Sequence, residues 1–472
     1  MDKSRQLGEA PVFRLLLRFT IPAVIATLIN ALYNVVDRIF IGQGVGSLGI
    51  AGVTIAFPVM LVNMAFGVLI GIGATSLLSI RLGERKHDEA ERILGNAVVL
   101  KVIIALITTA VGLIFLHPLL RILGASEAVL PYAQDYLQII LFGSVFQGIS
   151  FGVNNFIRAE GNPNRAMVTM LIGAGLNIAL DPLFIFVFEW GVRGAALATV
   201  LSHAVAAVWV MHYYISGRSS LRLRWSHMRL QPRIVKQIVI IGFPMFAMHL
   251  TSSVQNLIMN RSLMAYGGDI AISGMGVMFS LIIFLVMPVL GISQGVQPII
   301  GYNYGAKQYD RVKEALKQGI LIATGVVTVG FIITRLFPVQ LISMFNPNDP
   351  ELIAFGTRSM RIFFLGLPII GFQIVGSQYF QAVGKPKQAM ILGLSRQFFV
   401  LIPAILILPR FFGVDGIFAA IPLSDAIATG LTAGWLFYEM RALSQIEPQT
   451  LGEAEPLEAV SRPAIVDTPA RR

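Results

Sequence analysis

The sequence predicts an all-α membrane protein whose transmembrane helices form two similar six-helix lobes. Apolar residues make up 55% of the 472 residues and charged residues only 13%, and the mean hydropathy is +0.74. A soluble domain usually carries about 25% charged residues. Twelve apolar runs are long enough to span a bilayer, and the first half of the chain reappears in the second. These observations require lipid, not water, as the solvent over most of the surface.

The apolar runs set the number of spans. A spanning helix needs roughly 20 mostly apolar residues, and the runs are too long and too irregular in alternation for barrel strands. The first run follows four basic residues and is too long for a signal peptide, so we expect it to be retained as a helix. The twelve runs are 15–40, 52–79, 92–115, 132–157, 166–188, 195–215, 235–260, 273–300, 316–337, 353–381, 389–409 and 414–438.

An internal repeat relates the two halves. Residues 19–95 return 222 positions later, and residues 161–167 return at 384–390, one residue out of that register. A chain of two similar membrane halves predicts a transporter whose solute site lies between them and opens alternately to each side. The matched pairs are Pro22 with Pro244, Asn34 with Asn256, Phe57 with Phe279, Gly73 with Gly295, Gly83 with Gly305 and Asp88 with Asp310.

Basic residues predict the orientation and the domain boundaries. Loops rich in Lys and Arg alternate with loops that contain few, and by the positive-inside rule the basic loops and both termini are cytoplasmic. This arrangement in a plasma (inner) membrane explains the net charge of +11 without nucleic-acid binding. We expect an N-terminal lobe (1–215), a cytoplasmic linker (216–233), a C-terminal lobe (234–440) and a disordered tail (441–472).

Motifs for enzymatic chemistry are absent from the sequence. It contains no cysteine, no Walker-type phosphate loop, no strand-then-helix dinucleotide fingerprint and no HExxH, and its two GxSxG matches, at 148–152 and 291–295, lie inside predicted spans and form no nucleophile elbow. We therefore expect a protein that is not an enzyme and needs no cofactor. Without a nucleotide site, transport must use an ion gradient or a partner that supplies energy.

Two acids fall inside predicted spans of the first half. A charge at the bilayer centre costs at least about 2.5–3.5 kcal/mol, yet Asp37 and Asp181 both lie there. Asn30, Tyr33, Asn34 and Asp37 are spaced to share one face of the first helix. The alternative is that Asp37, which precedes Arg38, is an idle ion pair near a helix end.

The fifth and sixth helices contribute further polar residues. Asn177 and Asp181 share a face, and Pro182 removes a backbone donor beside the carboxylate. Freed carbonyls next to a carboxylate suit a small cation or a proton-linked water. Thr199 and His203 share a face of the sixth helix, and His203 can equally serve as a hydrogen-bonded bundle residue.

The second half does not repeat these acids, which favours a task performed in the first half alone. The counterparts of Asp37, Asp181 and Thr199 are Met259, Ala404 and Ile421. Asp425 takes the register position of His203 and has no evident partner in the sequence. The second half offers amides, which can line a solute path or bond between helices: Gln255, Asn256 and Asn260 on the seventh helix and Gln373 and Gln378 on the tenth.

Three segments together resemble the multidrug and toxic compound extrusion (MATE) family: Pro22 with the run 32–37 (LYNVVD), the loop 158–163 (RAEGNP), and the run 177–184 (NIALDPLF). The resemblance covers about residues 12–440. It implies two six-helix lobes arranged as a V around a central cavity, and export of cationic or amphipathic compounds in exchange for H⁺ or Na⁺. It implies no nucleic-acid partner, and we expect a monomer in the lipid bilayer.

The resemblance also assigns residues. It implies a cation site made of Asp37, Asn177, Asp181 and Thr199, which would be the metal ligands if Na⁺ is the coupling ion, and a hinge at Pro22. Some family members have acids in the seventh and tenth helices, where this chain has Gln255 and Gln373. The chain therefore resembles the branch that couples through the first lobe. The residues expected to support the site or the substrate path are Tyr33, Asn34, Asn154, His203, Gln255, Asn256 and Gln373.

We expect binding of the ion to relieve repulsion between Asp37 and Asp181 and to close the first, fifth and sixth helices. The solute cavity should be apolar and aromatic. A flippase for a lipid-linked substrate is the alternative function, and it would need cationic residues in the cavity. A channel is a third possibility. The candidate cavity residues are Tyr33, Phe57, Met64, Phe151, Met275, Met278, Phe279, Phe284 and Phe372.

Overall fold

The computed structural model describes residues 5–123, 125–344 and 350–445. Throughout these residues the regular structure is helical and no strand occurs, so the predicted fold class is confirmed. The described part contains eleven helices long and apolar enough to cross a membrane, or twelve if one bent pair is a single span. Most of the expected tail, from residue 446 onward, lies outside the described residues.

The N-terminal lobe contains six predicted spans, each of which overlaps a helix. The fourth span is broken, because α6 and the segment Ser144–Ala159 meet at an angle of 56°. The elements are α1 (Gln6–Glu9), α2 (Val12–Val45), α3 (Ser47–Gly83), α4 (His87–Ile114), α5 (Leu116–Ile122), α6 (Leu130–Phe142), α7 (Ser144–Gln147), the π-helix η1 (Gly148–Val153), α8 (Asn154–Ala159), α9 (Pro163–Pro182), the π-helix η2 (Leu183–Val187) and α10 (Gly191–Ile215).

The C-terminal lobe follows the short 3₁₀ turn η3 (Trp225–Met228). Its first element, α11 (Pro232–Gly305), contains two spans separated at Gly268, whose φ of 61° favours glycine. The remaining elements are α12 (Tyr309–Leu336), α13 (Pro338–Ser343), α14 (Pro350–Phe363), η4 (Phe364–Gly366), α15 (Leu367–Ala382), α16 (Pro386–Leu394), the π-helix η5 (Ser395–Leu401), α17 (Ile402–Ile407), α18 (Pro409–Phe412) and α19 (Val414–Gln445).

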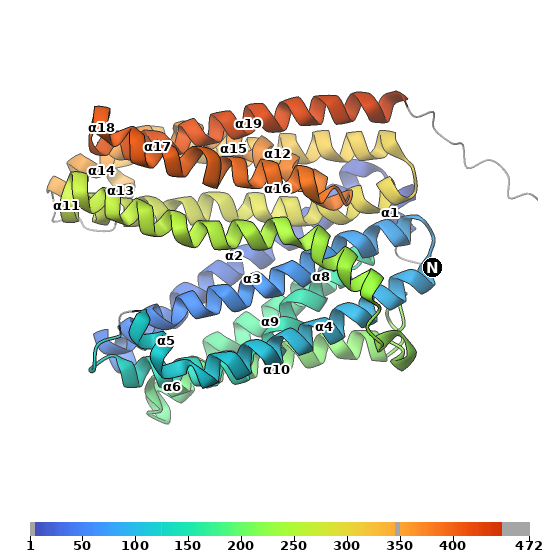
Figure 1. Ribbon diagram of the computed structural model, residues 1–472, viewed down its shortest axis with the longest axis horizontal. Helices are drawn as coiled ribbons and strands as arrows, with labels where there is room; N and C mark the ends of the chain where they lie inside the picture. Colours follow the sequence, from blue (N-terminus) through green and yellow to red (C-terminus); the bar gives the residue numbers. More distant parts are fainter. Residues whose placement is uncertain (1–4, 124, 345–349, 446–472) are drawn as a thin grey trace, which may run out of the picture.

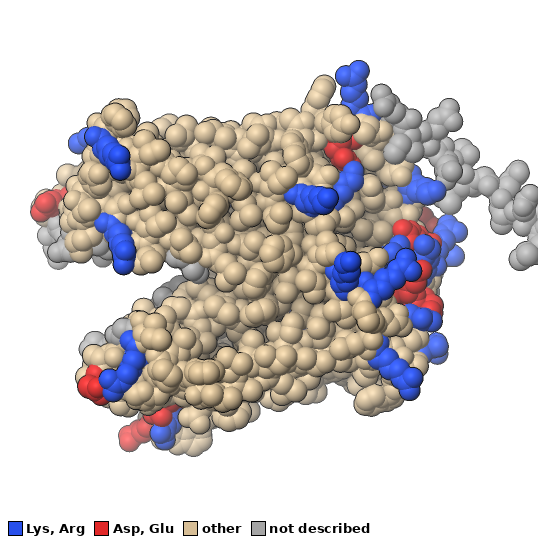
Figure 2. Space-filling model, viewed as in Figure 1, with Lys and Arg blue, Asp and Glu red and all other residues tan. Residues whose placement is uncertain are grey.

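The two lobes lie side by side and diverge toward one end. Figure 1 shows α4, α6, α9 and α10 in one lobe and α12, α15, α16 and α19 in the other. Figure 2 shows a cleft between the lobes that opens at the end opposite the N-terminus. Most Lys and Arg side chains visible in this view lie at the closed end.

Glycines in register bring the lobes into backbone contact at the closed end. A Cβ atom on Gly83 would lie 2.0 Å from the carbonyl oxygen of Tyr302, and one on Gly305 would lie 2.1 Å from the carbonyl oxygen of Ile80. These two contacts are copies of each other, because Tyr302 is 222 positions after Ile80. Only glycine permits such an approach between helices α3 and α11.

Polar side chains add two ties between the lobes near the same end. Gln297 donates through Nε2 to the hydroxyl of Ser76 at 3.0 Å. Arg158 donates through Nη1 to Oε1 of Gln294 at 2.7 Å. The closed end is therefore held by direct hydrogen bonds as well as by close packing.

Candidate functional site in the N-terminal lobe

The structure brings the two acids of the first half together. Asp37 on α2 is 8% exposed and Asp181 on α9 is fully buried. Their carboxyl groups interact through charge and through a side-chain hydrogen bond. Two ionised carboxyl groups in this proximity repel, so a proton or another cation between them stabilises the pair.

Asn177 connects this pair to α10. Its Nδ2 donates to Oδ1 of Asp181 and to the hydroxyl of Thr199, both at 3.2 Å. Both residues on α9 precede Pro182, where the α-helix gives way to the π-helix η2. Proline has no backbone N–H, so the carbonyl one turn earlier loses its helical donor. All four residues expected in the cation site thus lie in one buried cluster.

Two side-chain oxygens that α9 contributes to this cluster can each accept a further hydrogen bond. Within the described part of the chain, Oδ2 of Asp181 and Oδ1 of Asn177 are buried and receive no hydrogen bond. A buried acceptor without a donor is costly unless a proton, a cation or water meets it. Carboxylate, amide and hydroxyl oxygens are the ligand types that hard cations prefer. The cluster can therefore hold a proton or a small hard cation.

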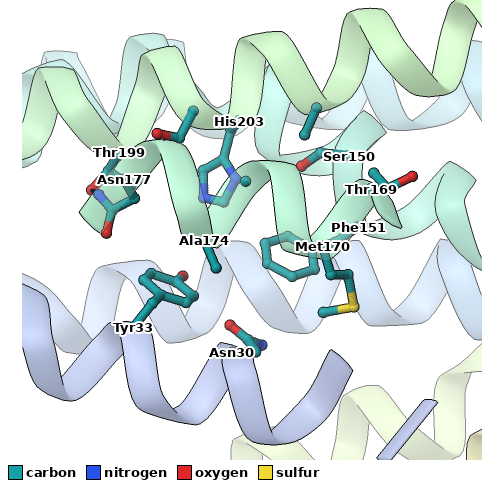
Figure 3. A pocket seen from close by; sticks show the side chains of 13 residues that line it. Asn30, Tyr33, Ser150, Phe151, Thr169, Met170, Ala174, Asn177, Thr199 and His203 are labelled. Atoms are coloured by element: carbon teal, nitrogen blue, oxygen red, sulfur yellow. Dashed lines mark hydrogen bonds between the residues drawn. The ribbon is translucent and has the colours of Figure 1, made fainter. Parts of the chain in front are cut away.

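A cavity adjoins the cluster. Figure 3 shows Asn30 and Tyr33 of α2 on one side of it and Thr199 and His203 of α10 on the other. The ring of Phe151 meets His203 edge-on at 5.2 Å between centroids. The side chains that line the cavity include no Asp, Glu, Lys or Arg. The lining residues are Asn30, Tyr33, Ser150, Phe151, Thr169, Met170, Gly173, Ala174, Asn177, Thr199, Ser202, His203 and Ala206.

The other expected site residues lie apart from this cavity. Asn154 is buried and donates to the carbonyl of Ala166 at 2.9 Å, which ties α8 to α9. In the C-terminal lobe, Gln255 and Asn256 belong to α11 and Gln373 is buried in α15. None of these four lines the cavity.

Two expected residues on α2 need separate mention. The side chain of Asn34 lies outside the described side chains. Pro22 is buried, and α2 runs through it without a break from Val12 to Val45. The missing N–H of proline removes one hydrogen bond from this part of the helix.

The expected aromatic cavity is only partly present. Tyr33 and Phe151 line it, whereas Met275 and Met278 lie in the hydrophobic core. Ser150, Thr169 and Ser202 also line the cavity and were not among the expected residues. Thr169 could have been found, because it continues the face of Asn177 two turns earlier along α9.

The structure supplies the partner of Asp425 that the sequence does not reveal. Nε of Arg396 in η5 donates to Oδ1 of Asp425 in α19 at 2.6 Å, and the carboxyl is 2% exposed. In the internal repeat, Arg396 corresponds to Gly173, 223 positions earlier, and Asp425 corresponds to His203, 222 positions earlier. In the C-terminal lobe an internal ion pair thus occupies the place of the N-terminal cavity.

A further buried cation, Lys101, lies inside a span of the first half and was not among the expected site residues. Lys101 in α4 is 4% exposed, and its Nζ donates to the carbonyl of Gly67 at 2.8 Å. Its stem crosses Gly152 in η1, where a Cβ atom would lie 2.0 Å from Cε of the lysine. No sequence motif surrounds Lys101, so only the packing of α3, α4 and η1 shows how it is accommodated.

Comparison with known proteins identifies the family. The sequence profile of MatE matches residues 22–183 and 244–406, one block in each lobe. The chain belongs to the MatE family. It is 28% identical to the multidrug export protein MepA of Staphylococcus haemolyticus (strain JCSC1435) over 447 residues, which cover 95% of this chain and 98% of that protein.

Solved MATE structures share the fold. The MATE multidrug transporter DinF-BH is 41% identical, with a TM-score of 0.86 over 92% of this chain and 97% of that one. A multidrug resistance MATE transporter in an outward-facing conformation is 25% identical, with a TM-score of 0.88 over 93% and 98%. Like these relatives, the protein is a multi-span membrane transporter.

Proposed function

We propose that this MATE protein is a secondary active exporter of cationic or amphipathic small molecules, which exchanges them for H⁺ or Na⁺. The observation that carries the proposal is the buried pair Asp37 and Asp181, which is linked to Thr199 by Asn177. The names of the relatives support it, since MepA is a multidrug export protein and DinF-BH a multidrug transporter.

The geometry suggests how the ion and the solute are coupled. A cation bound between Asp37 and Asp181 removes their repulsion and favours close packing of α2 against α9 and α10. The residues Asn30 and Tyr33 of α2 line the adjacent cavity, so this movement narrows it. Pro22 supplies the point at which α2 bends. The ion therefore favours the conformation with the narrow cavity, and the solute favours the conformation with the open cavity. Binding of one disfavours binding of the other.

We place the protein in the plasma membrane as a monomer, with the basic closed end and both termini in the cytoplasm. The cleft of Figure 2 then opens to the outside, as export requires. A lipid-phosphate flippase would need cationic residues around the solute, and the residues that line the cavity include none. The cavity therefore favours a cationic or neutral amphipathic solute.

Efflux from reconstituted vesicles tests the proposal. The wild-type protein should export a fluorescent organic cation when a pH gradient or a Na⁺ gradient is imposed, each applied separately. Asp37→Asn and Asp181→Asn should each reduce gradient-driven efflux to the level of protein-free vesicles, because an amide cannot exchange a proton or neutralise Na⁺. Thermal unfolding of the purified variants would show that both are folded.

Asp310→Asn serves as the control, because this carboxylate begins α12 with its side chain 87% exposed. It should leave efflux unchanged. Gradient-driven efflux that persists in folded Asp181→Asn would overturn the coupling role. The gradient that drives wild-type efflux identifies the ion.

A further inference from the structure

The linker between the lobes is fastened to the N-terminal lobe at several points. Glu160, fully buried at the end of α8, accepts hydrogen bonds from the hydroxyl of Ser219 and from the backbone N–H of Ser220, the latter at 3.2 Å. Glu91 on α4 accepts one from the backbone N–H of Arg222 at 2.9 Å. Buried carboxylates thus fix the path of the linker from its first residues.

Asn96 on α4 fixes the second part of the linker. Its Nδ2 donates to the carbonyls of His227 at 3.2 Å and Arg229 at 3.3 Å, and its Oδ1 accepts from the backbone N–H of Gln231 at 2.7 Å. A Cβ atom on the neighbouring Gly95 would lie 2.4 Å from the carbonyl oxygen of His227. The turn η3 is therefore pressed directly onto the backbone of α4.

This ordered linker nevertheless exposes apolar side chains. Trp225 is 87% exposed, although it begins the turn that Asn96 holds in place. Ile215 at the end of α10 is 74% exposed, and Leu230 is 42% exposed. Large apolar side chains presented from a fixed backbone indicate a surface that contacts something other than water.

The length of α4 places this surface at the edge of the hydrocarbon. A helix of 28 residues is about 42 Å long at 1.5 Å per residue, whereas the hydrocarbon core is about 30 Å thick. Counted from the apolar end at Ile114, about eight residues project beyond the core, roughly as far as Leu94. The turn η3 packs at Gly95 and Asn96, which is the boundary where tryptophan is enriched.

The linker and the start of α11 carry many basic side chains at this boundary. Residues 216–236 contain six basic side chains and no acid: Arg218, Arg222, Arg224, Arg229, Arg233 and Lys236. Arg224 lies 3.5 Å from Glu91, and His227 lies 3.5 Å from both Asp88 and Glu91. The other five basic residues form no ion pair within the described part of the chain. Figure 2 shows basic side chains gathered at this end of the molecule.

We propose that the linker is a binding surface for anionic phospholipid of the cytoplasmic leaflet, with the indole of Trp225 at the hydrocarbon boundary and the guanidinium groups of Arg222 and Arg229 on the lipid phosphate. Guanidinium groups bind phosphate in a bidentate manner, and an indole prefers the zone between acyl chains and headgroups. Glu160, Glu91 and Asn96 hold the backbone in place before the lipid binds, so little entropy is lost on binding.

Fluorescence quenching by brominated lipids tests this surface without any transport assay. The wild type and Trp225→Phe are reconstituted in nanodiscs of phosphatidylcholine with an equal mole fraction of dibrominated phosphatidylglycerol or dibrominated phosphatidylcholine. The difference between the two proteins reports Trp225 alone. We expect quenching of Trp225 by the anionic lipid to be at least about twofold stronger, since each basic residue near the surface strengthens binding about fivefold.

Two further variants make the outcome decisive. Arg222→Gln/Arg229→Gln should abolish the preference for the anionic lipid. Arg410→Gln, an exposed arginine in α18 at the opposite end of the molecule, should retain it. Equal quenching by the two lipids in the wild type, or a preference that persists in the double variant, would overturn the proposal. Loss of the preference on addition of 10 mM inorganic phosphate would indicate a small-anion site instead.

Discussion

The two lobes share a backbone plan but place their buried acids in opposite environments. In the N-terminal lobe, Asp37 and Asp181 meet each other, and Oδ2 of Asp181 receives no hydrogen bond within the described residues. In the C-terminal lobe, Asp425 meets the guanidinium of Arg396 at 2.6 Å. In the function that we propose, the first lobe binds an exchangeable cation between its acids, whereas the second lobe contains a cation fixed to the chain. Register in a repeat therefore relates positions of the backbone, but it predicts neither which residue occupies a position nor the role of that residue.

The largest expected effect on stability comes from removing the fixed cation, Arg396. Arg396→Leu leaves the carboxylate of Asp425 buried without its counter-charge and should lower the free energy of unfolding by about 3–5 kcal/mol. Arg396→Leu/Asp425→Leu removes both charges and should recover most of that loss. Thermal unfolding of the purified proteins measures both changes. If the double variant is no more stable than the single one, the pair is not coupled and the contrast between the lobes fails.

A second difference lies where the linker begins. The register position of Glu160 in the other lobe is held by Val383. Burial raises the pKa of the Glu160 carboxyl from 4.5 to about 7, although hydrogen bonds from Ser219, Tyr213 and the Ser220 backbone oppose the shift. Because the folded state holds this proton more tightly, the stabilisation is complete below pH 4.5 and is lost as pH rises through about 7.

Glu160→Gln should remove this pH dependence, which amounts to at most about 3 kcal/mol. Hydrogen exchange of residues 217–231, corrected for the intrinsic rate, should show weaker protection at pH 8 than at pH 5 in the wild type and no difference in the variant. Val383→Ala is the matched change at the register position and should leave the pH profile of the linker as it is. An unchanged profile in Glu160→Gln would contradict the role of this carboxyl.

The smallest expected effect on stability concerns the glycine contacts that both lobes contribute at the closed end. Gly83→Ala and Gly305→Ala each place a Cβ atom about 2 Å from a carbonyl oxygen of the opposite lobe. Each should destabilise the closed end by about 1–3 kcal/mol, and by similar amounts, because the two contacts are copies. Gly325→Ala is the control, because no atom of another helix lies within 4 Å of its Cβ position.

Opening of the closed end can be measured by labelling a single introduced cysteine, because the chain contains no cysteine of its own. A single cysteine at the buried position Ser79 should react faster with a water-soluble maleimide in both variants than in the Gly325→Ala control. Unequal rates in Gly83→Ala and Gly305→Ala would show that the two lobes do not contribute symmetrically to closure.

Local sequence was sufficient for the elements and for part of the site. Run length and hydropathy determine which segments can span a bilayer, and helical periodicity places Asn177 and Asp181 on one face, because both properties depend only on neighbouring residues. Asp37 and Thr199 were likewise noted as polar residues inside spans, the MATE resemblance grouped the four residues as one site, and the structure places all four in one cluster. The duplication was equally visible, since it is a property of residue order.

Packing between helices decided the rest. The partner of Asp425 lies 29 positions away on another helix, the carbonyl that binds Lys101 lies 34 positions away, and the linker turn is held by Asn96, more than 130 positions earlier. Such contacts follow from the crossing of helices and leave no periodic trace in the sequence. Composition and residue order thus determined that the chain spans a membrane in two lobes, whereas the tertiary structure determined which buried charges meet another side chain.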